Sequence, residues 1–156
     1  MKVVLMSDSH DHMDALRRAV DFCNQQDVGA VLHAGDLVAP FVHRALKELR
    51  APLTIVFGNN DGEKAGLYQV FKNKIFEPPH ELMIERRRIL MLHDPAKSLQ
   101  RPSVYDLILY GHLHETRVDK NENLQVNPGE LCGWLTGKST MALWDTVQNT
   151  AEIIVI

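Results

Sequence analysis

The stretch Leu53-Thr54-Ile55-Val56-Phe57-Gly58-Asn59-Asn60-Asp61 joins an apolar run directly to a short polar run. The apolar half predicts a buried strand, whereas the polar half carries no side chain able to fill a core. Three other places repeat this arrangement, because Asp8-Ser9-His10, Gly35-Asp36 and Gly111-His112-Leu113-His114 each follow an apolar run. In α/β sheets, ligand sites form outside the carboxyl ends of the strands. We therefore expect the four stretches to meet at one shared metal site.

Length and composition place the chain among ordinary globular proteins. The 156 residues suit one domain, expected over residues 1–156, and 45% of them are hydrophobic and 24% charged. The apolar runs at both ends are too short to span a bilayer, so we expect a cytoplasmic protein without membrane attachment. The net charge of −3 gives no general attraction to nucleic acid, and stable nucleic-acid binding is not expected.

Several conspicuous residues have ordinary interpretations. Cys23 shares helical spacing with neighbouring apolar residues and is interpreted as a small core residue. Arg86-Arg87-Arg88 lies between two strand-like runs, which favours a solvated hairpin turn, with help to a phosphate-bearing ligand as the alternative. The histidines at positions 12, 33, 43 and 80 are interpreted as surface or core residues rather than ligands.

The order of predicted elements indicates two sheets. Strands are predicted over residues 2–7, 29–32 and 53–57, and helices between them over residues 13–25 and 40–49, with Asp11 as the N-cap of the first helix. Such alternation implies parallel strands joined by right-handed crossovers. After a helix over residues 64–71, the chain predicts a hairpin around Arg87 and short, mostly antiparallel strands. These strands are expected at residues 106–110, 116–119, 124–126, 140–145 and 151–156.

The candidate metal ligands share oxygen or imidazole donors. They are Asp8, His10, Asp36, Asn59, His93, His112 and His114. Such donors suit borderline divalent metals such as Mn, Fe, Ni, Co or Zn. Seven ligands exceed the needs of one ion that keeps an open position, whereas two ions about 3.5–4 Å apart would use them all. Asp36 is the candidate bridge between the two ions.

Five motifs in this order resemble the motif set of the calcineurin-like metallophosphoesterases. They are Asp8-x-His10, Gly35-Asp36, Gly58-Asn59, His93 and Gly111-His112-x-His114. The resemblance covers the whole chain and is closest to small prokaryotic single-domain phosphodiesterases, which also show Gly58-Asn59-Asn60-Asp61-Gly62 and Asn127-Pro128-Gly129-Glu130. It implies a four-layer α/β/β/α sandwich of two mixed sheets flanked by helices. It also implies Asp8, His10 and His114 on one ion, Asn59, His93 and His112 on the other, and Asp36 bridging.

The activity that the resemblance implies is hydrolysis of a small phosphodiester. Hydroxide held between two divalent ions would attack phosphorus in line, with Asp36, Asn60 and His112 as the expected catalytic residues. Two divalent ions, two carboxylates and one hydroxide leave a charge of roughly +1. A monoanionic diester would neutralise this charge, whereas a dianionic monoester would exceed it, so diesters are favoured.

Two positions depart from the family pattern. Asn60 stands where many larger relatives have a histidine that acts as general acid, and the loss of acid catalysis costs about 10²–10⁴-fold. We therefore expect good turnover only for activated leaving groups, such as those of aryl phosphodiesters. Asp94-Pro95 follows His93 where relatives usually have glycine, and Pro95 restricts Asp94 to extended conformations. The geometry of the His93 loop is thus the part of the site that the resemblance defines least.

Two questions stay open at the level of sequence. The alternative function is a catalytically weak protein-interaction scaffold of the same fold, and the complete set of seven metal-competent side chains favours the enzyme. Ile153-Ile154-Val155-Ile156 is either an inner strand or a contact in a homo-oligomer.

Trp134 and Trp144 are interpreted as core or interface residues rather than as a stacking platform for a ligand.

Overall fold

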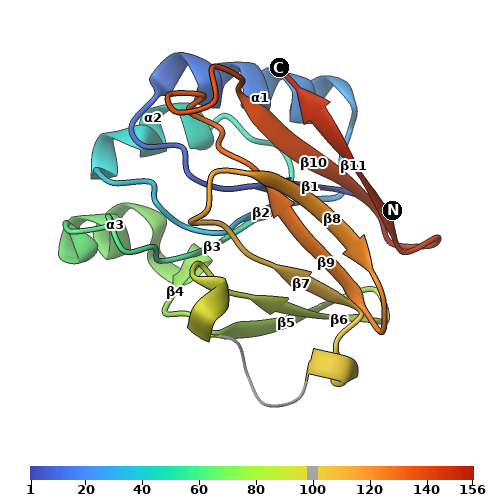
Figure 1. The fold of residues 1–156 in the computed structure, drawn as a ribbon. Helices are drawn as coiled ribbons and strands as arrows, with labels where there is room; N and C mark the ends of the chain where they lie inside the picture. Colours follow the sequence, from blue (N-terminus) through green and yellow to red (C-terminus); the bar gives the residue numbers. More distant parts are fainter. Residues whose placement is uncertain (98–101) are drawn as a thin grey trace.

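Two mixed β-sheets lie face to face, with the α-helices on the outer side of the first sheet (Figure 1). The computed structural model describes residues 1–97 and 102–156. Across the first sheet lie β11 (Thr150–Val155), β10 (Thr140–Asp145), β1 (Lys2–Met6), β2 (Ala30–His33), β3 (Leu53–Val56) and β4 (Ile75–Phe76). Across the second lie β5 (His80–Ile84), β6 (Arg87–Met91), β7 (Leu107–Leu109), β9 (Leu124–Pro128) and β8 (Thr116–Lys120). The predicted sandwich of two mixed sheets is confirmed.

Strand alternation explains how the first sheet separates two cores. Val4 and Met6 of β1 belong to the cluster that includes the buried face of α1 (Met13–Gln25), whereas Val3 and Leu5 belong to the cluster between the sheets. Successive strand side chains point to opposite faces, so both faces of β1 are apolar and buried. The helices α2 (His43–Leu46) and α3 (Lys64–Phe71) contribute to the first cluster.

Among the described residues, no α-helix covers the outer side of the second sheet. Between β6 and β7 the described residues form only two 3-10 turns, η3 (Pro95–Lys97) and η4 (Pro102–Val104). Next to η4, Tyr105 joins the outward-facing Leu90 and Ile108 in a small separate cluster. A few side chains therefore cover this face where the first sheet has helices. None of the helices in residues 1–97 and 102–156 combines the length and apolarity that a bilayer crossing requires.

The structure corrects several local predictions. The predicted helix over residues 40–49 is a 3-10 turn, η1 (Pro40–Val42), followed by the four residues of α2. After α3 the chain forms a further 3-10 turn, η2 (Lys72–Lys74), and then the short strand β4, neither of which was predicted. Residues 153–155 of the terminal run lie in β11, an edge strand of the first sheet and not an inner one. Pairing in the later strands is mostly antiparallel, as predicted, but it includes two parallel pairs, β6 with β7 and β7 with β9.

Candidate metal centre

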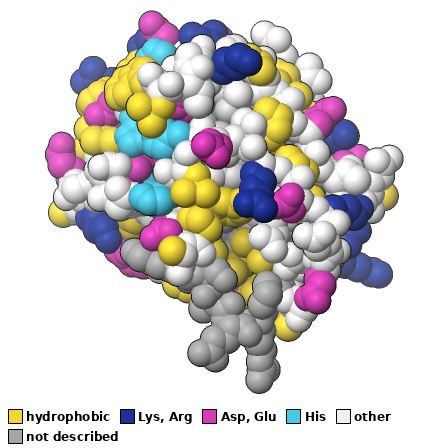
Figure 2. Space-filling view, in the orientation of Figure 1, with side chains coloured by type: hydrophobic (Ala, Val, Ile, Leu, Met, Phe, Trp, Pro, Cys, Tyr) yellow, Lys and Arg dark blue, Asp and Glu magenta, His cyan; other side chains and the backbone are white. Residues whose placement is uncertain are grey.

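The candidate ligands all follow parallel strands at their carboxyl ends. Asp8 and His10 follow β1, Asp36 follows β2, and Asn59 follows β3 of the first sheet. In the second sheet, His93 follows β6, and the histidines at 112 and 114 follow β7. Because parallel strands end at the same edge, both sheets deliver their ligands to one region, as the sequence predicts. In Figure 2, histidine side chains gather on one face of the molecule, next to hydrophobic side chains.

The first group of side chains contains Asp8, His10 and His114. Asp8 Oδ1 lies 3.8 Å from His10 Nε2 and 3.4 Å from His114 Nε2, and these three side chains form one group with metal-binding geometry. The two imidazole rings are stacked with their centroids 5.1 Å apart. The structure therefore brings together the three side chains that the resemblance assigns to one ion.

The second group is built around Asn59. Its Oδ1 lies 2.8 Å from His93 Nε2 and 2.8 Å from His112 Nδ1. His93 Nδ1 donates to the carbonyl oxygen of Ala34 at 2.8 Å, so Nε2 is the nitrogen that faces Asn59 and would bind a cation. His93 is 3% exposed, so the Asp94-Pro95 departure does not displace it from the site.

Asp36 lies between the two groups. Its Oδ2 is 3.5 Å from His10 Nε2 and 3.4 Å from His93 Nε2. Asn60 contacts the same carboxylate twice, since its backbone N–H donates to Oδ1 at 2.8 Å and its side-chain amide donates to Oδ2 at 2.7 Å. The position expected for a bridging ligand is thus occupied by a carboxylate whose orientation is held by Asn60.

Unpaired buried atoms provide the test of whether a cation fits here. Among the described residues, Asp8 Oδ1 and His10 Nε2 are buried without a hydrogen-bond partner. Buried polar atoms normally have partners, and leaving one unpaired costs about 1–3 kcal/mol. A divalent cation would satisfy both atoms at once, and it would suit the carboxylate and imidazole donors around them. The residues present therefore fit a divalent metal.

Backbone conformation at the site is unusual for these residue types. Positive φ angles occur at Asp8 (52°), His10 (40°), Asp36 (60°), His112 (71°) and His114 (58°). Such left-handed conformations are uncommon for residues with a side chain and cost of order 1–3 kcal/mol where they are strained. Their concentration in the candidate ligands indicates that the fold holds these side chains against local preference, which is typical of functional sites.

At the motif glycines, other residues of the site lie so close to the backbone that a side chain would not fit. A Cβ atom on Gly58 would lie 2.1 Å from Asp36 Oδ1, and one on Gly111 would lie 2.6 Å from Asp8 Oδ2. Only Gly35 among these three has a positive φ, at 100°. Gly58 is thus required because the Asp36 carboxylate occupies the space of a side chain, and Gly111 because Ser7 Oγ, 1.9 Å from such a Cβ, and the Asp8 carboxylate do so.

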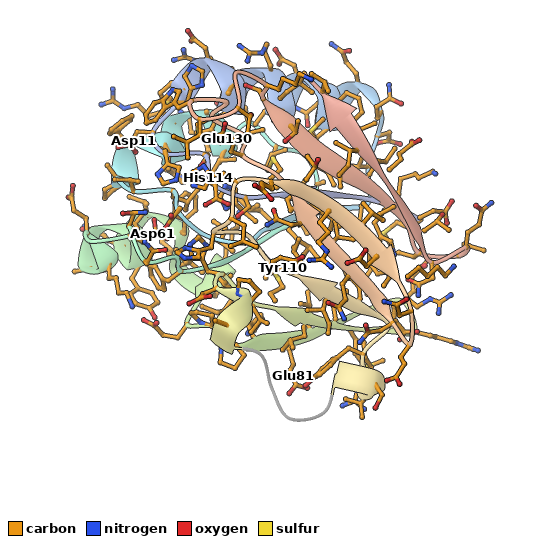
Figure 3. All side chains as sticks on the ribbon, viewed as in Figure 1. Asp11, Asp61, Glu81, Tyr110, His114 and Glu130 are labelled. Carbon is orange, nitrogen blue, oxygen red and sulfur yellow. The ribbon has the colours of Figure 1, made fainter. Side chains whose placement is uncertain are left out.

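Two further carboxylates hold the loops of the site together (Figure 3). Asp61 is 2% exposed and accepts hydrogen bonds from the backbone N–H groups of Asp36, Val38 and Gly58 at 2.7–3.0 Å. Asp11 accepts one from Ala39 N–H at 2.9 Å. Asp11 was predicted as a helix N-cap, and this was wrong: the N-cap is the next residue, and the carboxylate binds across to the β2 loop instead.

Glu130 is the site residue that sequence reasoning missed. It is fully buried, and its Oε2 lies 2.8 Å from His114 Nδ1 (Figure 3). Burial opposes ionisation, yet hydrogen bonds from His114 and Thr136 lower the pKa of Glu130 to about 2. Burial raises the pKa of the neighbouring Cys132 thiol to about 12. The Asn127-Pro128-Gly129-Glu130 motif contained the signal, since a single acidic residue there precedes the apolar Leu131 and Cys132.

The electrostatics of the site favour ionised carboxylates beside imidazoles. Burial of Asp36 opposes its charge, but contacts with His93 and Asn60 outweigh burial and hold its pKa well below the usual range. The contact with Asp8 raises the pKa of His10, against the effect of burial. Burial lowers the pKa of His33 to about 4, so this histidine, bonded to Ser9 Oγ at 3.1 Å, is neutral and belongs to the core.

A cavity borders the second group of side chains, and an exposed tryptophan borders the first. A cavity of about 400 Å³ lies beside Asn59, His93 and His112. On the other side, Trp134 is 61% exposed, with its ring 6.2 Å from that of His10. Trp134 is therefore not a core residue, in contrast to Trp144, which is fully buried as predicted.

Comparison with known proteins agrees with the motifs and the geometry. Residues 1–149 match the family described as the calcineurin-like phosphoesterase superfamily domain. A phosphodiesterase of Methanocaldococcus jannaschii is 33% identical over 165 aligned residues, covering 100% of this chain and 99% of the relative.

Solved structures extend the likeness to the fold. A structurally characterised archaeal phosphodiesterase superposes with a TM-score of 0.90 at 32% identity, and all of both chains is covered. Yfce, a phosphoesterase from E. coli, gives a TM-score of 0.75 at 19% identity, again over all of both chains, which shows a shared fold. On its sequence match, its two-sheet architecture and the side chains gathered at one sheet edge, the chain belongs to the calcineurin-like phosphoesterase superfamily.

Proposed function

We propose that the protein is a phosphodiesterase that requires two divalent metal ions. The observation that carries the proposal is the convergence of Asp8 Oδ1, His10 Nε2 and His114 Nε2, of which the first two are buried and otherwise unpaired among the described residues. The Asn59 group next to Asp36 supports a second ion. The likeness to the M. jannaschii phosphodiesterase supports the type of reaction.

The side chains of this chain would share the work around the ions. Bound there, a pair of divalent ions supplies a hydroxide nucleophile at neutral pH and positive charge for the phosphoryl oxygens during in-line displacement. Asp36 would bridge, with its carboxylate oriented by the two hydrogen bonds from Asn60. His112, exposed like Asn59 and unlike the buried His93, would face the phosphoryl group.

The charge beside the site supports a diester over a monoester. Lys64 lines the cavity, but its ammonium group contacts both carboxylate oxygens of Glu77 at 2.9 Å and adds no net charge. Asp94 also lines the cavity and is acidic. With the net charge of the loaded site at roughly +1, a monoanionic substrate is the better match. The cavity would hold one ester group of a small substrate.

Metal reconstitution tests the proposal. Metal-stripped protein should bind two ions per chain by titration calorimetry with Mn, Ni, Mg or Zn, and should regain hydrolysis of an aryl phosphodiester faster than of the matching monoester. Asp36→Asn should lose this activity, whereas Asp14→Asn, an exposed site on α1, serves as the matched control. If no metal restores activity and Asp36→Asn changes nothing, the protein-interaction scaffold is the correct function.

Leaving-group dependence tests the role of Asn60. Its amide is bound to Asp36 and cannot donate a proton to a leaving group at useful pKa, so the leaving group must depart with little help. Across a series of aryl phosphodiesters, we expect the rate to fall steeply as the pKa of the leaving phenol rises. A flat dependence would mean that another residue acts as the acid.

A further inference from the structure

Glu130 makes a set of contacts that exceeds what a loop residue needs. One carboxylate oxygen, Oε1, accepts from the backbone N–H groups of Leu135 and Thr136 and from the Thr136 hydroxyl. The other, Oε2, faces His114 Nδ1 at 2.8 Å and the Cys132 thiol at 3.2 Å. The side chain is fully buried, so these contacts replace its hydration. Glu130 thereby connects a candidate metal ligand to the loop that follows β9.

The same atoms could be taken for an independent metal site, since His114, Glu130 and Cys132 lie close enough together. Hydrogen-bond accounting argues against this. The donors around Glu130 already occupy both of its oxygens, and the Cys132 thiol is itself one of the donors. A cation here would displace contacts that are already satisfied. The arrangement is instead a carboxylate bonded to the back of an imidazole.

The contact determines which nitrogen of His114 has the proton. An ionised carboxylate only accepts hydrogen bonds, so Nδ1 must be the protonated nitrogen. Nε2 then has a free lone pair, and it is the atom that lies 3.4 Å from Asp8 Oδ1 in the first group. Histidine ligands commonly donate their other N–H to a carboxylate, which fixes the tautomer and the ring orientation.

We propose that Glu130 is a positioning residue that holds His114 in the Nδ1–H tautomer, ready to bind the ion of the first group. The inference rests on the proposed metal-dependent function and adds a specific determinant of metal affinity. Through Leu135 and Thr136, the same carboxylate also fixes the loop carrying Trp134, whose ring lies beside His10. The buried carboxylate of Glu130 thus orients the candidate ligand His114 and also fixes the Trp134 loop at the edge of the site.

The variant Glu130→Gln separates positioning from packing because it keeps the shape of the side chain. The fixed backbone donors of Leu135 and Thr136 require an acceptor, so the new amide would direct its oxygen to them and its NH₂ to His114. Nδ1 would then accept, and the proton would move to Nε2, the nitrogen needed for the metal. Cys132→Ala removes a neighbouring donor to the same oxygen without this inversion and is the matched control.

Two measurements test the inference. First, ¹⁵N NMR of metal-free protein at mildly alkaline pH should show His114 as the Nδ1–H tautomer in the wild type and in Cys132→Ala, and as Nε2–H in Glu130→Gln. Second, calorimetry should show metal affinity lowered about 10–100-fold in Glu130→Gln and nearly unchanged in Cys132→Ala.

The outcomes distinguish this inference from the proposed function. If the wild type binds no divalent ion, the proposed function fails, whereas the tautomer measurement still tests the Glu130 contact. If the wild type binds two ions and Glu130→Gln binds them equally well, the positioning role is wrong. Should Glu130→Gln not fold, an Nε2–H tautomer of His114 in the wild type would by itself overturn the inference.

Discussion

At the scale of single residues, the site depends on contacts between loops that are distant in sequence. The carboxylate of Asp36 lies against Gly58, and the backbone of Asp36 is bound in turn by Asp61. Each loop therefore leaves room for the other and fixes it. A small change in one loop should move a ligand that the other loop carries.

Substituting Gly58 measures this close approach. In Gly58→Ala the new Cβ would lie 2.1 Å from Asp36 Oδ1 and 2.5 Å from Asp36 N, and backbone atoms cannot yield as a flexible side chain can. We expect a loss of about 1–3 kcal/mol in unfolding free energy by urea denaturation, together with weakened metal binding.

Gly62→Ala is the matched control in the same loop. A Cβ there meets no described atom within 4 Å, and Gly62 has no positive φ. A stability change between zero and a gain of about 1 kcal/mol is expected for this variant. Equal losses in both variants would mean that the loop, and not the contact with Asp36, is the sensitive feature.

Residue by residue, the sequence predicted that seven candidate ligands would meet at one sheet edge, whereas the residues that support them were not predicted. The candidate ligands occur in short local motifs after apolar runs, so their spacing along the chain singled them out. Asp11, Asp61 and Glu130 act only through groups that folding brings close, as Asp11 does with Ala39 and Glu130 with His114. Most of their partners are backbone atoms or lie 16–28 residues away, and the sequence pattern does not record such contacts.

At the scale of elements, Arg87 of the basic triplet Arg86-Arg87-Arg88 has a structural role. Arg87 begins β6, and His93 follows its other end, so the arginine lies about 20 Å from the site at 3.3 Å per strand residue. Its guanidinium group contacts Asp106 at 2.8 Å and the carbonyl oxygens of Thr146 and Val147. This joins the second sheet to the turn between β10 and β11. The hairpin interpretation holds, and help to a phosphate-bearing ligand at the site is excluded by position.

The pH dependence of stability reports on this junction. Burial opposes ionisation of Asp106, but hydrogen bonds from Arg88 N–H and Arg87 lower its pKa below the ordinary value of 3.8. A lowered folded-state pKa stabilises the protein above the unfolded-state pKa, and this contribution is lost as pH falls through the folded-state value. Asp106→Asn should therefore cost about 1–2 kcal/mol at neutral pH, with the deficit shrinking below about pH 4.

Asp14→Asn is the comparison for that experiment. Asp14 also contacts an arginine, Arg17, at 2.9 Å, but both side chains are more than half exposed. Exposed pairs contribute little, and the expected loss is below about 0.5 kcal/mol at any pH. Denaturant titrations of the three proteins across the acidic range would show the difference. A deficit of Asp106→Asn that stays constant with pH would mean that the carboxylate acts through packing instead of charge.

The elements also show why strand pairing was harder to predict than strand positions. The apolar patterns of β10 and β11 gave their location, but both join the first sheet, where β10 pairs with β1. Lys2 and Asp145 are register partners in these strands, and Lys2 Nζ lies 3.2 Å from Asp145 Oδ2. Nearly the whole chain separates these two residues in the sequence. Local alternation determines which residues are extended, whereas the partner strand depends on the assembled sandwich.

At the scale of the whole molecule, one apolar cluster joins the two sheets. It contains Leu5 and Leu32 from the first sheet, Met91 and Leu109 from the second, and the fully buried Trp144 of β10. Because each sheet buries its inner face only against the other, neither half should be stable alone. We therefore expect residues 1–156 to unfold as a single cooperative unit, which is the one-domain organisation that the length favours.

The two tryptophans make this expectation measurable. Trp134 is exposed beside the site and Trp144 is fully buried between the sheets. In Trp134→Phe, the remaining fluorescence would report on the sheet interface alone, while far-UV circular dichroism follows all elements. For two-state unfolding in urea, both signals should give the same midpoint. The exposed substitution should change stability by no more than about 0.5 kcal/mol.

Removing the buried indole provides the complementary result. Trp144→Ala should cost about 3–5 kcal/mol, since it leaves a cavity between the sheets and removes the partner of Asn149, whose side-chain oxygen now accepts from the indole at 3.0 Å. In this variant the remaining fluorescence comes from the exposed Trp134 beside the site, and if the sheets form one unit, its midpoint should fall together with the dichroism midpoint. A fluorescence midpoint in Trp134→Phe that precedes the dichroism midpoint would instead mean that the sheets separate before they unfold. The metal site, which draws ligands from both sheets, would then open before the rest of the protein, and added metal should bring the two midpoints together.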